Sequence, residues 1–320
     1  MPCSKSEVSP KIPRLVLTFL VMCAVVARGQ QAVSSITQAR LFTNPNAPGT
    51  ESVDANGTAL PEDESASDSG DDSFGAQIIL KNQERPRKFS LFSDISISRT
   101  DNVDLLPRGS RSDSFLGVRA GGAWKPILSS QLIGEISMSA SVLRYDRANE
   151  LDFETIGVGG GLSWLVPNTP GIILFGRYDF TEVLDASSDE LLEDHALTAG
   201  LQKIFVFGRS HFLSTGINGA LGFSKPRSEQ RDQAAIQADY HLQITRSVDA
   251  DLVYRYAAQF YNESDRLDHN QTLSLSVGFM PNRWLRFSGS ISAARNDSNE
   301  AEFEYDVFNF GGGIRGDISF

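Results

Sequence analysis

Ten charged side chains share one phase of an alternating apolar–polar pattern that begins near residue 89 and continues to the end of the chain. They are Asp94, Arg119, Glu135, Arg177, Asp179, Asp239, Asp251, Arg255, Arg286 and Arg315. Opposed acidic and basic side chains around one space would orient polar solutes such as sugars or zwitterions. Alternatively, these charges pair and only satisfy one another. The sequence leaves both interpretations open, and Asp251 with Arg255 is a candidate local pair.

Nucleophilic catalysis is the main alternative chemistry, because some membrane proteins of this size hydrolyse lipids. It needs a Ser activated by a nearby His and a third polar group that orients the His. The four histidines are His195, His211, His241 and His269. None forms an H-x-S pair, and no G-x-S-x-G or H-E-x-x-H motif occurs. We therefore expect no enzyme, with a membrane hydrolase as the low-ranking alternative.

Metal binding would need a cluster of hard oxygen ligands. The segment 181–194, TEVLDASSDELLED, carries six carboxylates, which suit Ca²⁺ or Mg²⁺. A solvated external loop explains the same composition more simply. We expect no metal site and no cofactor.

Twelve segments carry the alternating pattern, which is typical of β-strands with one apolar face. Their first apolar residues are Phe89, Leu116, Leu132, Ile156, Ile172, Leu197, Leu213, Ala234, Val248, Leu273, Leu285 and Phe308. Long and short spacings alternate along this series. Tight turns at one end of an even number of strands and long loops at the other are typical of an outer-membrane β-barrel. The sequence therefore predicts an all-β fold, an up-and-down antiparallel transmembrane barrel of 12 strands.

The two faces of the predicted strands differ in the way a membrane barrel requires. One phase is apolar, as in Leu116, Val118 and Ala120, whereas the charged residues fall mid-strand on the other. The aromatic residues gather near strand ends, as they do at membrane interfaces. We expect an aromatic girdle of Trp124, Trp164, Trp284, Tyr145, Tyr178 and Phe260. The apolar phase should therefore face lipid and the charged phase the lumen.

The final segment, FNFGGGIRGDISF (308–320), alternates to its last residue. In lipid every backbone group must pair, so the last strand should close against the first. A chain that ends on Phe after such a strand resembles bacterial outer-membrane proteins with a C-terminal targeting strand. That resemblance implies that the barrel-assembly machinery reads this strand and that Phe320 is its insertion signal.

A narrower resemblance concerns PNRWLRFSGSISAARNDSN (281–299) and EYDVFNFGGGIRGDISF (304–320). These segments resemble the last hairpin of the putative β-barrel porin-2 group, with its W-L strand opening, R-x-D-S loop and Y-D before the closing strand. The resemblance covers about 40 residues and loosely implies a channel.

Two further segments precede the barrel region of residues 88–320. Residues 1–29 have a basic start and the apolar run LVLTFLVMCAVVA, which predicts a cleaved signal peptide and export. Both cysteines, Cys3 and Cys23, lie in this segment, so we expect no disulfide in the mature chain. Residues 30–87 are acidic and poor in apolar side chains, which predicts a disordered periplasmic segment.

Composition and lumen chemistry together point to transport in the bacterial outer membrane. The net charge of -11 argues against binding of duplex nucleic acid. The lumen phase is rich in small residues, such as Gly157, Gly159 and Gly161, which leave room for a narrow water-filled passage. The predicted function is a porin-like channel for passive diffusion of small polar solutes, with outer-membrane lipids as neighbours. A non-conducting receptor or structural anchor is the other alternative, and an autotransporter translocator is disfavoured because no large passenger precedes the barrel.

Overall fold

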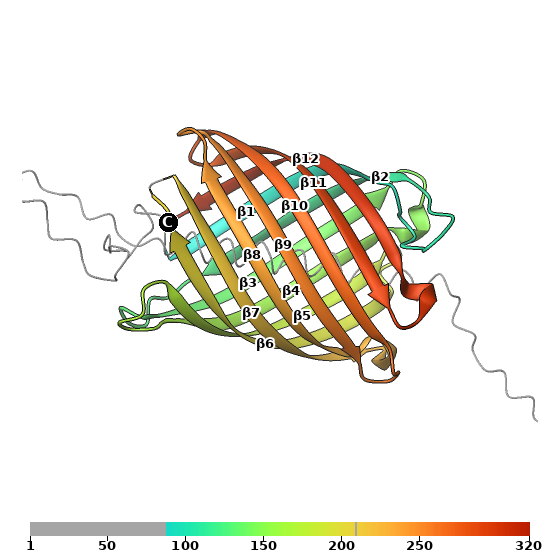
Figure 1. Ribbon diagram of the computed structural model, residues 1–320. Coiled ribbons are helices and arrows are strands. Elements are labelled where there is room, and N and C mark those ends of the chain that lie inside the picture. Colours follow the sequence, from blue (N-terminus) through green and yellow to red (C-terminus); the bar gives the residue numbers. More distant parts are fainter. Residues whose placement is uncertain (1–87, 209) are drawn as a thin grey trace, which may run out of the picture.

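A computed structural model describes residues 88–208 and 210–320, and over these residues the chain forms one closed antiparallel barrel of twelve strands (Figure 1). Each strand pairs with its neighbour in the sequence, so the topology is up-and-down. The strands are β1 (Phe89–Thr100), β2 (Asp113–Trp124), β3 (Leu132–Tyr145), β4 (Phe153–Leu165), β5 (Ile172–Asp185), β6 (Glu190–Val206), β7 (His211–Lys225), β8 (Arg231–Gln243), β9 (Val248–Tyr261), β10 (Leu267–Asn282), β11 (Leu285–Ser298) and β12 (Tyr305–Ser319). Three short 3-10 turns also occur in the described part, η1 (Asn149–Leu151), η2 (Arg227–Glu229) and η3 (Ala301–Phe303). The predicted fold class is confirmed.

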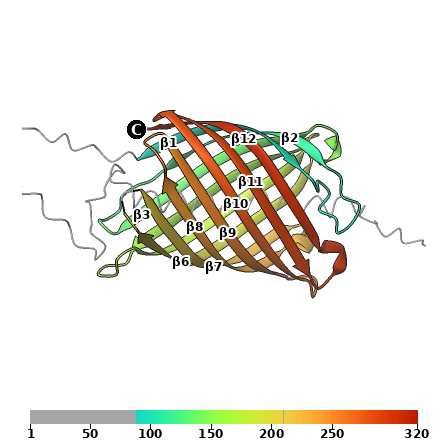
Figure 2. The same cartoon turned by 45° about the horizontal axis from the view of Figure 1, so that its top comes forward.

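The barrel closes where β12 lies beside β1 (Figure 2). The paired register runs from Ser90 opposite Ser319 to Thr100 opposite Asn309. Phe89 and Phe320 extend this seam with two backbone hydrogen bonds of 3.0 Å, one in each direction. The ring of Phe89 stacks on that of Phe320 at a centroid distance of 5.8 Å and on Trp124 at 6.2 Å. The terminal Phe therefore completes the last ladder and an aromatic stack at the same end of the barrel.

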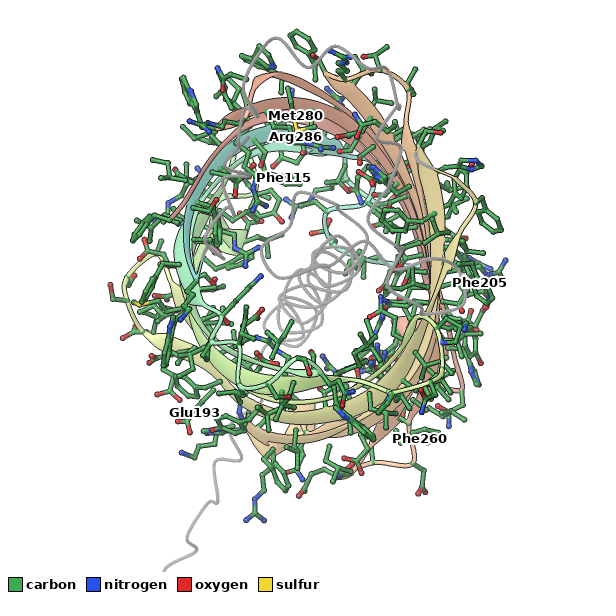
Figure 3. The ribbon with its side chains drawn as sticks, turned by 90° about the vertical axis from the view of Figure 1, so that its left-hand side faces the viewer. Phe115, Glu193, Phe205, Phe260, Met280 and Arg286 are labelled. Atoms are coloured by element: carbon green, nitrogen blue, oxygen red, sulfur yellow. The ribbon has the colours of Figure 1, made fainter. Side chains whose placement is uncertain are left out.

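Side-chain exposure alternates along the strands, and the apolar phase points outward. Val118, Met138 and Ile314 are exposed, whereas their strand neighbours Arg119, Ser139 and Arg315 are less so. Figure 3 looks along the barrel, with Phe205 and Phe260 outside the wall and Arg286 inside it. A water-soluble barrel would place the apolar phase inside. This wall instead presents a continuous apolar exterior, which is the arrangement that lipid requires.

The connections differ from the expected contrast between short turns and long loops. At the end that holds the C terminus they are residues 125–131, 166–171, 207–210, 244–247 and 283–284; at the other end they are 101–112, 146–152, 186–189, 226–230, 262–266 and 299–304. The predicted loop over 181–194 is wrong, because β5 and β6 pair through most of it and only residues 186–189 lie outside the two strands. Polar residues continue the strand pattern beyond the apolar band, and water can solvate such an extension. The spacing of the first apolar residues therefore follows the ends of the apolar band rather than the ends of the strands.

The predicted signal peptide and acidic segment, residues 1–29 and 30–87, lie outside the described residues. No helix in the described part of the chain is long and apolar enough to cross a membrane.

The outward position of Val118 gives a direct test of the faces. Val118→Arg should cost roughly 2–4 kcal/mol if the residue lies near the middle of a bilayer, and it should impair assembly. Leu128→Arg, in the connection 125–131, is the control and should cost only about 0–1 kcal/mol at an interface. The urea midpoint of refolding into lipid vesicles measures both. A tolerated Val118→Arg variant would mean that the face assignment is inverted.

Candidate functional site: the charged interior of the barrel

The structure places all ten charged residues singled out in the sequence on the inward face, because large apolar side chains hold the alternate, outward positions. Arg177 of β5 is the centre of the first network. Its Nη1 donates to Glu135 Oε1 of β3 at 2.8 Å, and its Nε donates to Asp179 Oδ2 at 2.7 Å. Lys125 Nζ adds a second cation 3.5 Å from Glu135 Oε2. Two acids and two bases thus neutralise one another along the wall.

A second network joins β8, β9 and β11. Arg286 Nη1 donates to Asp249 Oδ2 at 2.7 Å, and Nη2 to Asp251 Oδ2 at 3.3 Å. His241 Nδ1 lies 2.6 Å from Asp251 Oδ1. The predicted pairing of Asp251 with Arg255 is therefore wrong. Four residues along a strand span about 13 Å, too far for an ion pair, whereas a residue two strands away is within reach.

The third network lies at the closing seam. Asp94 of β1 sits between Arg119 of β2 and Arg315 of β12, each directly opposite it in the strand register. Arg315 also holds Asp317 through two hydrogen bonds of 2.7 and 2.9 Å. The ring of Phe92 lies 5.2 Å from the Arg119 guanidinium carbon and 4.9 Å from that of Arg315. The seam is therefore closed by side chains as well as by backbone hydrogen bonds.

The two remaining members lie on β8 and β9. Asp239 Oδ2 accepts a hydrogen bond of 3.2 Å from the Gln237 amide. Arg255 makes no ion pair with a residue in the described part of the chain, although it is only 7% exposed.

A cavity follows the inside of the barrel beside these networks. Its lining begins with Ser90 and Lys125 at the end that holds the C terminus, passes Arg177 and Ala220, and reaches Arg231 at the other end. The ion pairs join neighbouring and next-neighbouring strands and so lie along the wall. A cavity lined by charged and small polar side chains therefore extends along the inside of the barrel.

Five of the six predicted girdle residues lie on the outer surface. Trp124, Trp164 and Trp284 are exposed near the C-terminal end of the barrel. Phe260 is exposed near the opposite end, and Tyr178 is exposed near the middle of β5.

The prediction for Tyr145 is wrong. Tyr145 is 4% exposed and packs with Val103, Leu151 and Phe153 in a small apolar core under the connections. It follows the outward Arg144, so strand alternation turns it inward, where its ring meets that of Phe115 at 5.5 Å.

The histidines bear on the hydrolase alternative. Three of them are outward and lie beside tyrosine hydroxyls: His195 Nδ1 is 2.7 Å from Tyr178, His211 Nδ1 is 3.0 Å from Tyr240, and His269 Nδ1 is 2.7 Å from Tyr256. His241 is inward and bonds Asp251. These pairs supply no serine nucleophile.

A buried polar cluster lies at the barrel end away from the C terminus. Glu229 of η2 is 3% exposed, with its Oε2 3.9 Å from Arg231 Nη1. Burial raises the pKa of the Glu229 carboxyl, and the opposing attraction of Arg231 and Arg266 is weaker. The guanidinium of Arg266 lies between the rings of Tyr261 and Phe303, at 4.1 and 3.4 Å from their centroids. This cluster holds the connections together.

Sequence reasoning missed several members of the inner networks. Asp249 and Asp317 have the same inward phase as Asp251 and Arg315, so the alternation contained the signal for them. Lys125 lies just after β2 and His241 near the end of β8, where phase alone does not reveal a partner. Their roles follow from register, which a single sequence does not give.

Comparison with solved structures finds outer-membrane proteins similar to this chain. An outer-membrane channel from Pseudomonas putida F1 aligns over 72% of this chain and 96% of its own, with 8% identity and a TM-score of 0.50. The KdgM porin aligns over 70% and 98% at 6% identity and a TM-score of 0.39. The β domain of the Bordetella autotransporter BrkA aligns over 72% and 99% at 9% identity and a TM-score of 0.43. At 8% identity the likeness to the Pseudomonas putida channel shows the fold alone.

No family model and no curated protein matches the chain in sequence. The narrower resemblance of residues 281–320 to the putative β-barrel porin-2 group therefore stays a prediction.

The Arg177 network should stabilise the barrel wall. Arg177→Met removes the partner of two carboxylates whose side chains are 19% and 25% exposed, and it should lower the free energy of unfolding by about 1–3 kcal/mol. Arg295→Met is the matched control, since Arg295 forms an exposed outward pair with Asp297 and should contribute little. Urea titrations of the refolded variants compare them. Equal midpoints would show that the inner network adds no stability.

The raised pKa of Glu229 predicts the direction in which the free energy of unfolding changes with pH. The folded state binds this proton more tightly than the unfolded state, so its contribution to stability is present at low pH and lost as pH rises through the raised pKa. Glu229→Gln should therefore be more stable than the native chain at about pH 8, and the difference should shrink toward about pH 4.

Glu150→Gln is the control with the opposite sign. The hydrogen bond from Arg111 lowers the pKa of Glu150, so this substitution should reduce stability most above the ordinary carboxyl pKa. Chemical unfolding at both pH values measures both variants. A Glu229→Gln advantage that grows on acidification would contradict the assignment.

Proposed function

We propose that this chain is an outer-membrane channel through which small polar solutes diffuse passively. The observation that carries the proposal is the cavity lined from both ends of a barrel whose outer surface is apolar. An apolar exterior suits a bilayer, and a polar interior is of use there only where water or a polar ligand enters. The ion pairs lie along the wall beside this cavity, so they leave space that such solutes could occupy.

The inner surface offers hydroxyl groups and fixed charges to polar solutes. One part of the wall carries small hydroxyl or backbone groups, including Ser96, Ser98, Ser274, Ser276, Ser288, Ser290, Gly311 and Gly313. The charged networks occupy other parts of the wall, close to the end that holds the C terminus. Hydroxyl donors beside fixed charges hydrogen-bond hydrated solutes weakly and in several orientations, which suits diffusion rather than retention.

The proposal assigns no catalytic role, cofactor or metal to the chain. Its partners would be outer-membrane lipids and, through β12 and Phe320, the barrel-assembly machinery. The seam between β1 and β12 supports that role for β12, since this strand completes the barrel. Export would follow from the predicted signal peptide.

Single-channel recording tests the proposed function. The full chain, refolded and inserted in a planar bilayer, should give discrete conductance steps. Ala220→Trp places a large side chain in the cavity and should lower the step size, because Ala220 is inward and lines the passage. The matched control Ala140→Trp, on the outward face, should leave the steps unchanged.

A silent bilayer with a correctly folded, heat-modifiable barrel would contradict the channel. The receptor, anchor and hydrolase alternatives would then lead. Equal conductance in both Trp variants would show that current does not pass through the barrel interior.

A further inference from the structure

Arg255 differs from the other inward arginines in having a neutral surrounding. It lies near the middle of β9, with Gln237 of β8 and Thr272 of β10 directly opposite it in the register. Along its own strand the inward neighbours are Val253 and Ala257. No hydrogen bond or ion pair joins Arg255 to any residue among 88–208 and 210–320, and its Nη2 is buried without an acceptor.

The comparison with the other guanidiniums makes the exception clear. Arg177 bonds Glu135 and Asp179, and Arg286 bonds Asp249 and Asp251. Arg119, whose Nε is also unsatisfied, has the carboxylate-bearing Asp94 directly opposite it. The charge that acts most on Arg255 is another cation, Arg231. Among the inward arginines of the described strands, Arg255 is therefore the one with neither an ion pair nor a carboxylate directly opposite it.

A buried guanidinium without an ion-pair partner needs another source of compensation for its charge. An ionised side chain that is 93% removed from water, as the 7% exposure of Arg255 implies, is costly unless hydrogen-bond acceptors or an opposite charge surround it. Arginine does not lose its proton at physiological pH, so deprotonation does not remove this cost. Asp239 lies diagonally across on β8, but its Oδ2 accepts from Gln237 and it forms no ion pair with Arg255.

The geometry points to an external oxyanion as the missing partner: we propose that Arg255 is the centre of a binding site for the carboxylate or phosphate group of small anionic solutes inside the barrel. A guanidinium offers a planar fork of N–H donors that fits two oxygens of such a group at once. Gln237 and Thr272 place neutral polar side chains on either side, although each already donates a hydrogen bond, to Asp239 and Asn270 respectively. Ala257 and Ala235 keep nearby inward positions small. The inference deepens the proposed function, on which it rests, by naming a class of solute.

Calorimetric titration of the refolded full chain in detergent with inorganic phosphate tests the site without requiring current. Phosphate should bind the native chain saturably. Arg255→Gln should weaken binding by at least about tenfold, which corresponds to about 1.4 kcal/mol. Arg315→Gln removes the same charge from an ion-paired position and is the matched control, with binding close to native.

Recording the reversal potential in a salt gradient gives a second measure. Arg255→Gln should shift selectivity toward cations more than Arg315→Gln does. Arg255→Lys keeps the charge but loses the fork, so its phosphate affinity should fall between those of the native and Gln chains. Because it keeps the charge, it also serves as the test variant if Arg255→Gln fails to fold, as judged by heat modifiability.

The outcomes separate the two proposals. Absence of phosphate binding to the native chain, or equal weakening by Arg255→Gln and Arg315→Gln, would overturn the oxyanion site even in a conducting channel. Binding that depends on Arg255 in a chain that gives no current would support the site and overturn the channel.

Discussion

The pairing of β1 with β12 is the constraint on which the rest of the structure depends. An open sheet of this size would leave two edges with unpaired N–H and C=O groups, which lipid cannot solvate. The ladder from Ser90 and Ser319 to Thr100 and Asn309 removes those edges, and the reciprocal bonds of Phe89 and Phe320 extend it to the last residue. Closure also fixes one inside and one outside for every strand, because side chains alternate with a period of two.

The charged interior follows from that division. Once one face is committed to an apolar exterior, every mid-strand charge on the other phase must enter the lumen. The register then decides which charges meet. Arg177 reaches Glu135 two strands away, Asp94 meets Arg119 and Arg315 across adjacent strands, and Arg255 meets only Gln237 and Thr272. A one-residue slip of any strand would move the inward side chains of that strand to the exterior.

Much of this organisation was readable from the sequence because period-two alternation is a local signal. The strand number, the outward apolar phase of Val118 and the closing role of the last strand needed no information beyond that pattern. The pairing of Asp251 did not follow from it, because Arg286 is brought near by the register between β9, β10 and β11 rather than by sequence distance.

The errors at strand ends have a different cause. Residues 181–194 are polar enough for a loop, yet the ladder between β5 and β6 continues through most of them. Tyr145 is an aromatic residue near a strand end, as expected for a girdle, but its position in the alternation is inward. That position determines where its ring lies. In both cases residue type alone is misleading, because backbone pairing follows the alternation.

The central claim is that the polar face of this barrel borders a water-filled passage while the apolar face borders lipid. Single cysteines along β11 test it most directly, with Cys3 and Cys23 replaced by Ser so that each variant carries one thiol. In vesicles, a membrane-impermeant thiol reagent should label cysteines placed at Ser288, Ser290 and Ser292 and spare those at Gly289, Ile291 and Ala293. The reverse pattern would invert the faces, and protection at all six positions would show that water does not reach the middle of the barrel.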